Sequence, residues 1–324
     1  MKAVYAVKQD KIENEPLKYG DLDLPAIEEG QVLVKVQANG VCHSDLHIIE
    51  GDFPLPKELF PLVPGHEIVG EVVESKNRNV KEGERVGIGW FYSACGQCEY
   101  CTSGRENLCP NATVTGINRW GGYAESVMLD GNYVSKIPEG LDSAEAAPLF
   151  CAGITAYSSV RKIGPKVGDR IAVFGVGGLG FYAIQMIEAA GARAIAVTSS
   201  HNKVAEMAGA SEVIEEPKEG YDAAIVFAPN SSIVAKAVKS VKPGGTVVVP
   251  AIMDKIEVPF QYFTWEKNIT SVASGFRSET RSVLKLAADG RLKSMIKTMP
   301  LSEAKTALMD LKRGKVQGRI VLKP

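Results

Sequence analysis

The sequence predicts an α/β protein with two domains, one made of short strands and loops and the other built around a parallel sheet. The chain has 324 residues, which is more than a single hydrophobic core usually organises. Its first part is rich in short alternating or β-branched runs broken by Gly and Pro, as in residues 31–36, 68–73 and 85–89. From Arg170 onward strands alternate with helical segments, a pattern typical of a parallel sheet with both faces covered.

The elements of the second half can be placed one after another. Helix-forming residues dominate from 143 to 162. We then expect strands and helices in turn, with the strands at 170–176, 193–198, 221–228, 246–252 and 269–273 and the helices at 179–190, 202–208 and 231–241. The tail predicts helices over 280–289 and 301–313 and a strand over 319–322. These residues alone leave open which of the two domains the tail completes.

The overall charge is close to neutral, and this argues against several kinds of partner. The chain carries 37 Lys and Arg against 38 Asp and Glu, a formal net charge of −1. No basic excess is available to neutralise the phosphates of a nucleic acid. No apolar run approaches the ~20 residues that span a bilayer, and the first residues lack the features of a secretory signal. We therefore expect a cytoplasmic protein that binds neither nucleic acid nor membrane.

Four cysteines lie close together in the pattern Cys95-x2-Cys98-x2-Cys101-x7-Cys109. Four thiolates complete a tetrahedral Zn²⁺ shell with Zn–S distances of about 2.3 Å and leave no position for a substrate. We therefore expect a structural zinc site here. The alternative is four unrelated buried thiols, and the balanced charge argues against a zinc ribbon that binds nucleic acid.

The two remaining cysteines suggest a second metal site. Cys42 lies among histidines in Cys42-His43-Ser44-Asp45-Leu46-His47, and His66 and Cys151 follow further along the chain. Two thiolates and one imidazole would leave a fourth zinc position open, as in catalytic zinc sites. A lone Cys or His is more often a packed core residue than a ligand, so spacing alone leaves both interpretations open.

A glycine-rich loop follows the strand expected at 170–176. It reads Gly175-Val176-Gly177-Gly178-Leu179-Gly180 and leads into a predicted helix. Gly175 would make the tight turn, Gly177 would let the backbone approach a pyrophosphate, and Gly180 would allow close packing of helix on strand. In this strand–loop–helix context the motif predicts a dinucleotide site at the helix N-terminus.

The turn after the next strand bears on which dinucleotide is bound. It reads Thr198-Ser199-Ser200-His201-Asn202-Lys203 and contains no acidic residue to bind the 2′-hydroxyl of NAD. Hydroxyl groups and a lysine suit the 2′-phosphate of NADP. A solvated turn with a helix cap at Ser199 or Ser200 is the alternative. We favour NADP over NAD.

Taken together, these motifs give the chain a family resemblance. It resembles the zinc-containing medium-chain alcohol dehydrogenases in residues 40–47, 64–70, 95–109, 121–125 and 149–157 and in the glycine loop. The matching segments span most of the chain. Within the family it looks most like the cinnamyl-alcohol-dehydrogenase branch, through residues 151–157 and the Ser-Ser-x-x-Lys segment. That branch prefers NADP.

The resemblance implies roles for the residues of the candidate metal site. Cys42, His66 and Cys151 match the catalytic zinc ligands, with Glu67 as an occasional alternate ligand. Asp45 matches a carboxylate that orients His66 from outside the ligand set.

The resemblance also assigns proton transfer, cofactor contacts and the substrate pocket. Ser44 and His47 match the proton relay. The other matching positions are cofactor contacts at His43 and Arg319 beside the pyrophosphate and at Thr155 near the nicotinamide, and pocket walls at Phe53, Trp90 and Trp120.

The resemblance resolves the place of the tail. A GroES-like β-barrel catalytic domain would consist of residues 1–152 with 278–324, and a Rossmann dinucleotide-binding domain, doubly wound around a parallel sheet, of residues 153–277. Cys151 would then lie at the junction of the domains, with its zinc beside the nicotinamide. The family forms homodimers and homotetramers, although the segments after Lys203 are short here, which puts oligomer contacts carried there in doubt.

The implied reaction is the reversible oxidation of an alcohol, primary and aliphatic or aromatic, to an aldehyde or ketone. The chain would use two Zn²⁺ and NADP or NAD. Zinc lowers the pKa of the alcohol, hydride passes to the nicotinamide, and the proton leaves through Ser44, the cofactor ribose and His47. One alternative is a polyol or threonine dehydrogenase, against which Cys151 argues because those relatives usually carry a carboxylate there. The other is a non-enzymatic dinucleotide sensor with a structural zinc only.

Overall fold

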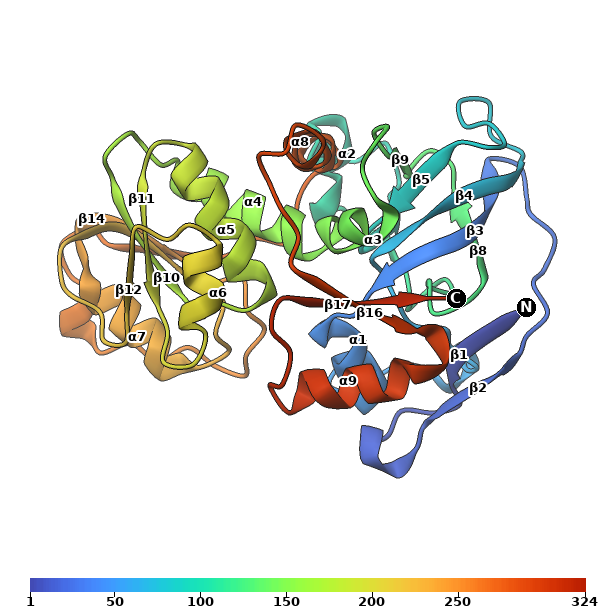
Figure 1. Ribbon diagram of the computed structural model, residues 1–324, viewed down its shortest axis with the longest axis horizontal. Helices are drawn as coiled ribbons and strands as arrows, with labels where there is room; N and C mark the ends of the chain where they lie inside the picture. The colour runs from blue at the N-terminus through green and yellow to red at the C-terminus, as the bar shows by residue number, and fades with distance from the viewer. The chain divides into compact units, whose positions relative to one another are not determined.

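The computed structural model describes residues 1–324, which form two compact units. Unit 1 consists of Met1–Cys151, Phe276–Ala288 and Ser294–Pro324, and unit 2 of Ala152–Gly275 and Asp289–Lys293. Figure 1 shows strands dominating the first unit and alternating strands and helices making up the second. The predicted fold class is confirmed.

Unit 1 is organised by a seven-stranded sheet in the order β16-β17-β3-β4-β5-β9, with β8 also paired to β3. Neighbouring strands are antiparallel, except that β16 and β17 are parallel. The strands are β3 (Gln31–Gly40), β4 (Ile68–Ser75), β5 (Arg85–Ile88), β8 (Ser126–Asp130), β9 (Ser135–Lys136), β16 (Ile296–Pro300) and β17 (Arg319–Lys323). Alternate residues Val32, Val34 and Val36 of β3 are buried in the core. Because β17 pairs with the end of β3, the C-terminal tail belongs to this unit.

Smaller elements complete unit 1. They are β1 (Lys2–Ala6), β2 (Leu17–Asp21), β6 (Phe91–Ser93), β7 (Thr113–Val114), the helices α1 (His43–Glu50), α2 (Glu99–Thr102), α3 (Ser143–Ala146), α8 (Arg277–Ala288) and α9 (Ala304–Lys312), and the 3-10 helices η1 (Ile12–Asn14), η2 (Lys57–Leu59), η3 (Glu106–Leu108), η4 (Ala147–Phe150) and η6 (Leu301–Glu303). Helix α1 was not singled out in the sequence. Its first turn is closed by the Asp45 carboxylate, which accepts from the Cys42 N–H at 3.0 Å, and Gly51 ends it in the left-handed conformation.

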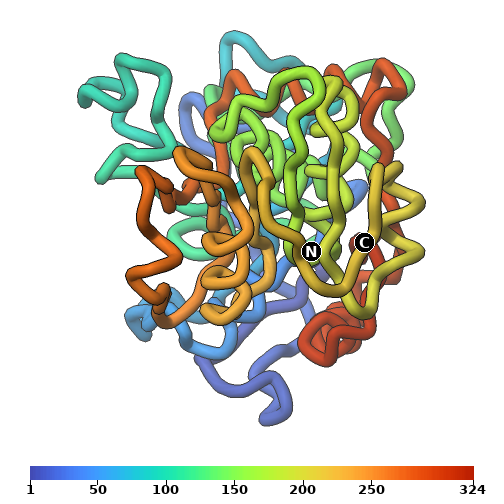
Figure 2. Tube along the Cα trace, turned by 90° about the vertical axis from the view of Figure 1, so that its left-hand side faces the viewer, coloured from blue at the N-terminus to red at the C-terminus, as the bar shows by residue number.

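Unit 2 contains a six-stranded, fully parallel sheet in the order β12-β11-β10-β13-β14-β15. The elements are the strands β10 (Arg170–Phe174), β11 (Arg193–Val197), β12 (Glu212–Ile214), β13 (Tyr221–Val226), β14 (Val241–Val248) and β15 (Asn268–Thr270), the helices α4 (Ala152–Ile163), α5 (Gly178–Ala189), α6 (Asn202–Met207) and α7 (Ser231–Ser240), and η5 (Phe260–Tyr262). In Figure 2 the trace of this unit runs from lime green through yellow to orange. Strand order reverses between β10 and β13, the switch point at which doubly wound sheets bind dinucleotides.

Several element boundaries differ from those expected. The helical stretch expected over 143–162 is divided by η4, since Pro148 lacks the N–H that a continuous α-helix needs. The strand expected over 246–252 begins earlier, at Val241, and ends at Val248. The helix expected over 301–313 starts with the 3-10 turn η6 before α9. No helix of the structure combines the length and the apolar character needed to cross a membrane.

Candidate active site and metal centres

Four residues of unit 1 that are far apart in sequence converge on one point. Cys42 lies at the N-terminus of α1, His66 and Glu67 lie just before β4, and Cys151 follows η4. Their ligand atoms all lie within 4.8 Å of one another, and the two sulfurs are 3.8 Å apart. The structure thus brings together the three predicted ligands and the predicted alternate ligand.

Unpartnered polar atoms in this cluster show what kind of group it fits. His66 Nε2 and Glu67 Oε2 are buried and have no hydrogen-bond partner. Buried polar atoms rarely lack partners in folded proteins. Two thiols, an imidazole nitrogen and a carboxylate oxygen are all ordinary zinc ligands. The residues therefore fit a zinc ion.

Asp45 binds His66 at Nδ1, the ring nitrogen that does not take part in the cluster. Its Oδ1 accepts from His66 Nδ1 at 2.8 Å and from the Gly65 N–H at 3.2 Å. Both side chains are fully buried. The bond places the imidazole proton on Nδ1, which leaves Nε2 free to act as a ligand.

The charges of the cluster favour a cation. The hydrogen bond from the Cys151 thiol, together with His66, lowers the pKa of Cys42 well below its usual value. The same bond and burial raise the pKa of Cys151, so negative charge is favoured on the Cys42 sulfur. Burial opposes a charge on His66, but Asp45 and Cys42 raise the pKa of His66 well above its usual value.

Glu67 forms a buried ion pair with Arg319, the first residue of β17. Both side chains are almost completely buried. Burial raises the pKa of Glu67 to about 7, against the opposing effect of the Arg319 guanidinium. Sequence reasoning gave these residues separate roles, as an alternate ligand and as a pyrophosphate contact. It missed the pair because 252 positions separate the partners.

The predicted relay residues lie on α1. Ser44 and His47 are three positions apart, so they share one side of the helix. His47 Nδ1 lies 2.6 Å from Asp52 Oδ2, and its ring meets Phe53 edge-on with centroids 6.2 Å apart. Sequence reasoning missed Asp52, although a carboxylate five residues after a candidate relay histidine was a usable signal.

The three aromatic residues expected to line the substrate pocket have different immediate neighbours. Trp90 meets the His66 ring edge-on, with centroids 4.9 Å apart at 88°. Phe53 lies against His47 instead. Trp120 donates its indole N–H to the Pro61 carbonyl at 3.0 Å.

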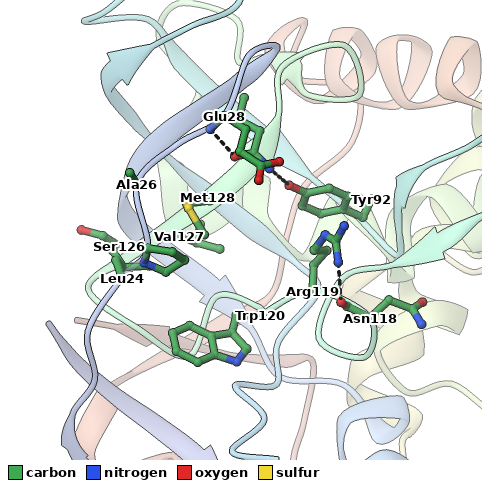
Figure 3. A pocket seen from close by; sticks show the side chains of 12 residues that line it. Leu24, Ala26, Glu28, Tyr92, Asn118, Arg119, Trp120, Ser126, Val127 and Met128 are labelled. Carbon is green, nitrogen blue, oxygen red and sulfur yellow. Dashed lines mark hydrogen bonds between the residues drawn. The ribbon is translucent and has the colours of Figure 1, made fainter. Parts of the chain in front are cut away.

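Trp120 also lines a separate surface hollow of about 380 Å³, which Figure 3 shows. The Arg119 guanidinium lies 5.9 Å from the centre of the Tyr92 ring, and Figure 3 shows both side chains and Trp120 along the hollow. None of the residues lining this hollow is a candidate zinc ligand.

A second cluster brings together Cys95, Cys98, Cys101 and Cys109 around α2. Their sulfurs all lie within 4.8 Å of one another, and none of the four forms a disulfide. The backbone N–H groups of the loop, led by that of Gln97, lower the pKa of Cys95 to about 6. A thiolate is thus favoured before any ion is considered, and four sulfurs fit a closed tetrahedral zinc site.

The glycine loop of unit 2 lies at the switch point of the sheet. Gly175 adopts φ +87°, which other residues rarely adopt. A Cβ on Gly180 would lie 2.4 Å from the Gly175 carbonyl oxygen. Helix α5 begins at Gly178 and continues through Leu179, so their N–H groups lie in its first turn. A Cβ on Gly177 would meet no atom within 4 Å, so the backbone is open to a ligand there.

The turn after β11 is organised by Thr198. Its hydroxyl accepts from the N–H of His201 at 3.1 Å and of Ser200 at 3.4 Å. Helix α6 has His201 at its N-cap without a side-chain capping bond. The alternative of a cap at Ser199 or Ser200 is therefore wrong. Ser199 and Ser200 are exposed at this turn.

Comparison with known proteins identifies the family. The model of the alcohol dehydrogenase GroES-like domain matches residues 28–139, and that of the zinc-binding dehydrogenase domain matches residues 178–289. The chain is 41% identical to an alcohol dehydrogenase of Geobacillus stearothermophilus over 325 aligned positions, covering 95% of both chains. The chain belongs to the zinc-type medium-chain alcohol dehydrogenases.

Solved structures agree with this assignment. The cinnamyl alcohol dehydrogenase of Sorghum bicolor superposes with a TM-score of 0.90 at 26% identity, covering 99% of this chain and 97% of the other. The cinnamyl alcohol dehydrogenase of Helicobacter pylori, solved with NADP(H), gives 0.90 at 25% identity, with the same coverage of 99% and 97%. This alcohol dehydrogenase therefore lies near the cinnamyl-alcohol-dehydrogenase branch.

Membership of the family settles the class of activity. The protein is an enzyme that transfers hydride between alcohols and a nicotinamide dinucleotide, and zinc belongs to its chemistry. The alternatives of a non-enzymatic sensor and of a polyol or threonine dehydrogenase are not favoured.

Proposed function

We propose that this alcohol dehydrogenase holds two zinc ions per chain. Cys42, His66 and Cys151 would hold the catalytic ion, with Glu67 as an alternate ligand. The cysteines at 95, 98, 101 and 109 would hold the structural ion. The observation that carries the proposal is the convergence of four ligand atoms within 4.8 Å, with His66 Nε2 buried and unpartnered.

The residues around the catalytic ion have separate tasks in the proposed reaction. A bound zinc supplies a Lewis acid that lowers the pKa of an alcohol oxygen. Asp45 keeps the His66 imidazole in the tautomer with Nε2 free. Ser44 Oγ would accept the proton of the alcohol and release its own proton through the cofactor ribose. His47 would then pass a proton to solvent, since its 30% exposed ring is in reach of water. Asp52 fixes a proton on His47 Nδ1, so the other ring nitrogen, Nε2, exchanges protons with solvent.

The substrates proposed are primary aliphatic and aromatic alcohols and their aldehydes. Trp90 supports this choice because it presents an apolar wall against His66. The names of the sorghum and Helicobacter relatives point to an aromatic alcohol.

Two measurements on the purified protein test the proposal. Zinc analysis should give two ions per chain, and absorbance of the reduced nicotinamide should rise with alcohols of the proposed classes. Turnover of an alcohol panel with only one zinc per chain would refute the proposal of two zinc ions while leaving the family assignment intact.

NADP is proposed as the preferred dinucleotide, with contacts from Thr198, Ser199, Ser200 and Lys203. We expect Ser199→Asp to lower the ratio of kcat/KM with NADP to that with NAD by about tenfold, because a carboxylate repels a 2′-phosphate and accepts from a ribose hydroxyl. Steady-state kinetics with both cofactors measures the ratio. Ser199→Asn is the control of similar size without charge, and an equal change in both variants would contradict the role of charge.

The dinucleotide itself is proposed to bind along the loop Gly175–Gly180. The open space at Gly177 and the helix N-terminus at Gly178 support a pyrophosphate site there. His43 and Arg319 are proposed as further pyrophosphate contacts, and Thr155 as a contact near the nicotinamide.

A homodimer or homotetramer is proposed as the assembled form. Large apolar side chains are exposed between β14 and the edge strand β15, with Phe260 at 80% and Trp265 at 75% exposure. Such patches usually mark interaction surfaces. A mass of one 34.8 kDa chain in light scattering would contradict the proposal.

We further propose a cytoplasmic location, where thiol ligands stay reduced. The proposed domain boundaries are 1–152 with 278–324 for the catalytic domain and 153–277 for the dinucleotide-binding domain.

A further inference from the structure

The carboxylate of Asp45 is surrounded by four hydrogen-bond donors. Oδ1 accepts from His66 Nδ1 and the Gly65 N–H, and Oδ2 accepts from the Cys42 N–H at 3.0 Å and the Tyr123 hydroxyl at 3.1 Å. Three of these donors belong to the candidate ligands or to the residue next to one. The Tyr123 hydroxyl is the only donor that comes from another part of the chain.

Tyr123 is itself firmly held. Its N–H donates to the Pro64 carbonyl at 3.0 Å, and its carbonyl accepts from the Val4 N–H at 2.8 Å. Its ring lies so close to Gly65 that a Cβ there would be 2.4 Å from Cδ1. The side chain is completely buried, so its hydroxyl has a fixed direction.

We propose that Tyr123 is a positioning residue for the catalytic metal centre, because its hydroxyl fixes the Asp45 carboxylate that in turn orients His66. This inference rests on the proposed zinc site. Tyr123 is new to the proposed site, because it is not in contact with the ligand atoms and no role was predicted for it.

The effect follows from how a carboxylate can move. The bond from Tyr123, together with that from the Cys42 N–H, restrains the Asp45 carboxylate from turning about its Cβ–Cγ bond, so Oδ1 stays in line with His66 Nδ1. Burial and the nearby Asp45 raise the pKa of Tyr123 well above its usual value, so the hydroxyl remains a donor at all working pH values. Without it, Oδ2 keeps one donor and His66 is less well oriented for a metal ion.

The test is the rate at which the holoenzyme releases zinc to the coloured chelator 4-(2-pyridylazo)resorcinol. Release should occur in two phases, and the phase absent from Cys42→Ser belongs to the catalytic site. We expect Tyr123→Phe to accelerate this phase about tenfold, since partners of metal ligands typically change metal affinity 10–100-fold. The phase of the four-cysteine site should not change.

Tyr92→Phe is the matched control. Tyr92 is a buried tyrosine of the same unit whose hydroxyl meets Gln31 at 3.5 Å rather than Asp45. Its removal should leave both phases unchanged.

A double-mutant cycle separates positioning from a general loss of packing. In an Asp45→Asn background, Tyr123→Phe should have little further effect on zinc release. Equal acceleration in both backgrounds would show that the hydroxyl does not act through Asp45. A release rate in Tyr123→Phe within twofold of the unaltered enzyme, or failure of the variant to fold, would also overturn the inference.

The zinc-release experiment distinguishes failure of the proposed zinc site from failure of the role of Tyr123. If no phase of zinc release from the unaltered enzyme is missing from Cys42→Ser, the zinc assignment fails whatever Tyr123 does. If two phases exist and Tyr123→Phe leaves both unchanged, only the role of Tyr123 is rejected.

Discussion

His66→Ala is expected to lower kcat about a thousandfold while dinucleotide binding is retained. The loss of the imidazole ligand removes the ion that activates the alcohol, an effect worth several kcal/mol in zinc enzymes; a thousandfold corresponds to about 4 kcal/mol. Cys42→Ala should behave in the same way, since both residues supply ligand atoms to one cluster. Dinucleotide binding should survive because the glycine loop belongs to unit 2.

Steady-state kinetics, zinc analysis and a dinucleotide titration by fluorescence check this expectation together. The four-cysteine site is an internal control, because its zinc should remain and the content should fall from two ions to one. Near-normal turnover in either variant would show that the cluster around His66 is not the catalytic centre.

Arg319→Met is expected to lower the free energy of unfolding by about 3–5 kcal/mol, because it leaves the Glu67 carboxylate buried without its partner. The pKa of Glu67, already raised to about 7, should rise further. A carboxyl group whose pKa is higher in the folded state loses stability as pH rises through the interval between its unfolded and folded values. The variant should therefore become less stable from pH 5 to pH 8, more steeply than the unaltered protein. Urea unfolding at several pH values measures both effects.

Two controls accompany this variant. Glu67→Gln combined with Arg319→Met removes both charges and should recover part of the lost stability. Lys305→Met breaks the exposed ion pair with Glu15, and exposed pairs contribute little. If Arg319→Met cost no more than Lys305→Met, the buried ion pair would have no energetic role.

Features that depend on neighbours in the sequence could be predicted from it. The loop from Gly175 to Gly180 follows a short apolar strand and precedes a helix, and each part is defined within a few residues. The same holds for the cysteines from Cys95 to Cys109, whose spacing alone brings four sulfurs together. The convergence of Cys42, His66 and Cys151 was only suggested by the residues, and the family resemblance was needed to choose it.

Features that depend on tertiary contacts could not be predicted. The Glu67–Arg319 pair and the bond from Tyr123 to Asp45 join residues 252 and 78 positions apart, and no local pattern marks either one. Trp90 and Trp120 are both aromatic residues that were predicted as pocket walls. Only the fold shows that Trp90 lies against His66. The break at Pro148 had a local cause that the run of helix-forming residues around it concealed.

The pairing of β17 with the end of β3 has a consequence for biosynthesis. The residues of unit 2 lie almost entirely in one continuous stretch, whereas unit 1 needs both the first forty residues and the last six. On the ribosome, the residues of unit 2 are therefore made before unit 1 has β17, the strand that joins β16 to β3. The Glu67 carboxylate likewise gains its guanidinium partner only after Arg319 has been made, so the first part of unit 1 stays incomplete while unit 2 is synthesised.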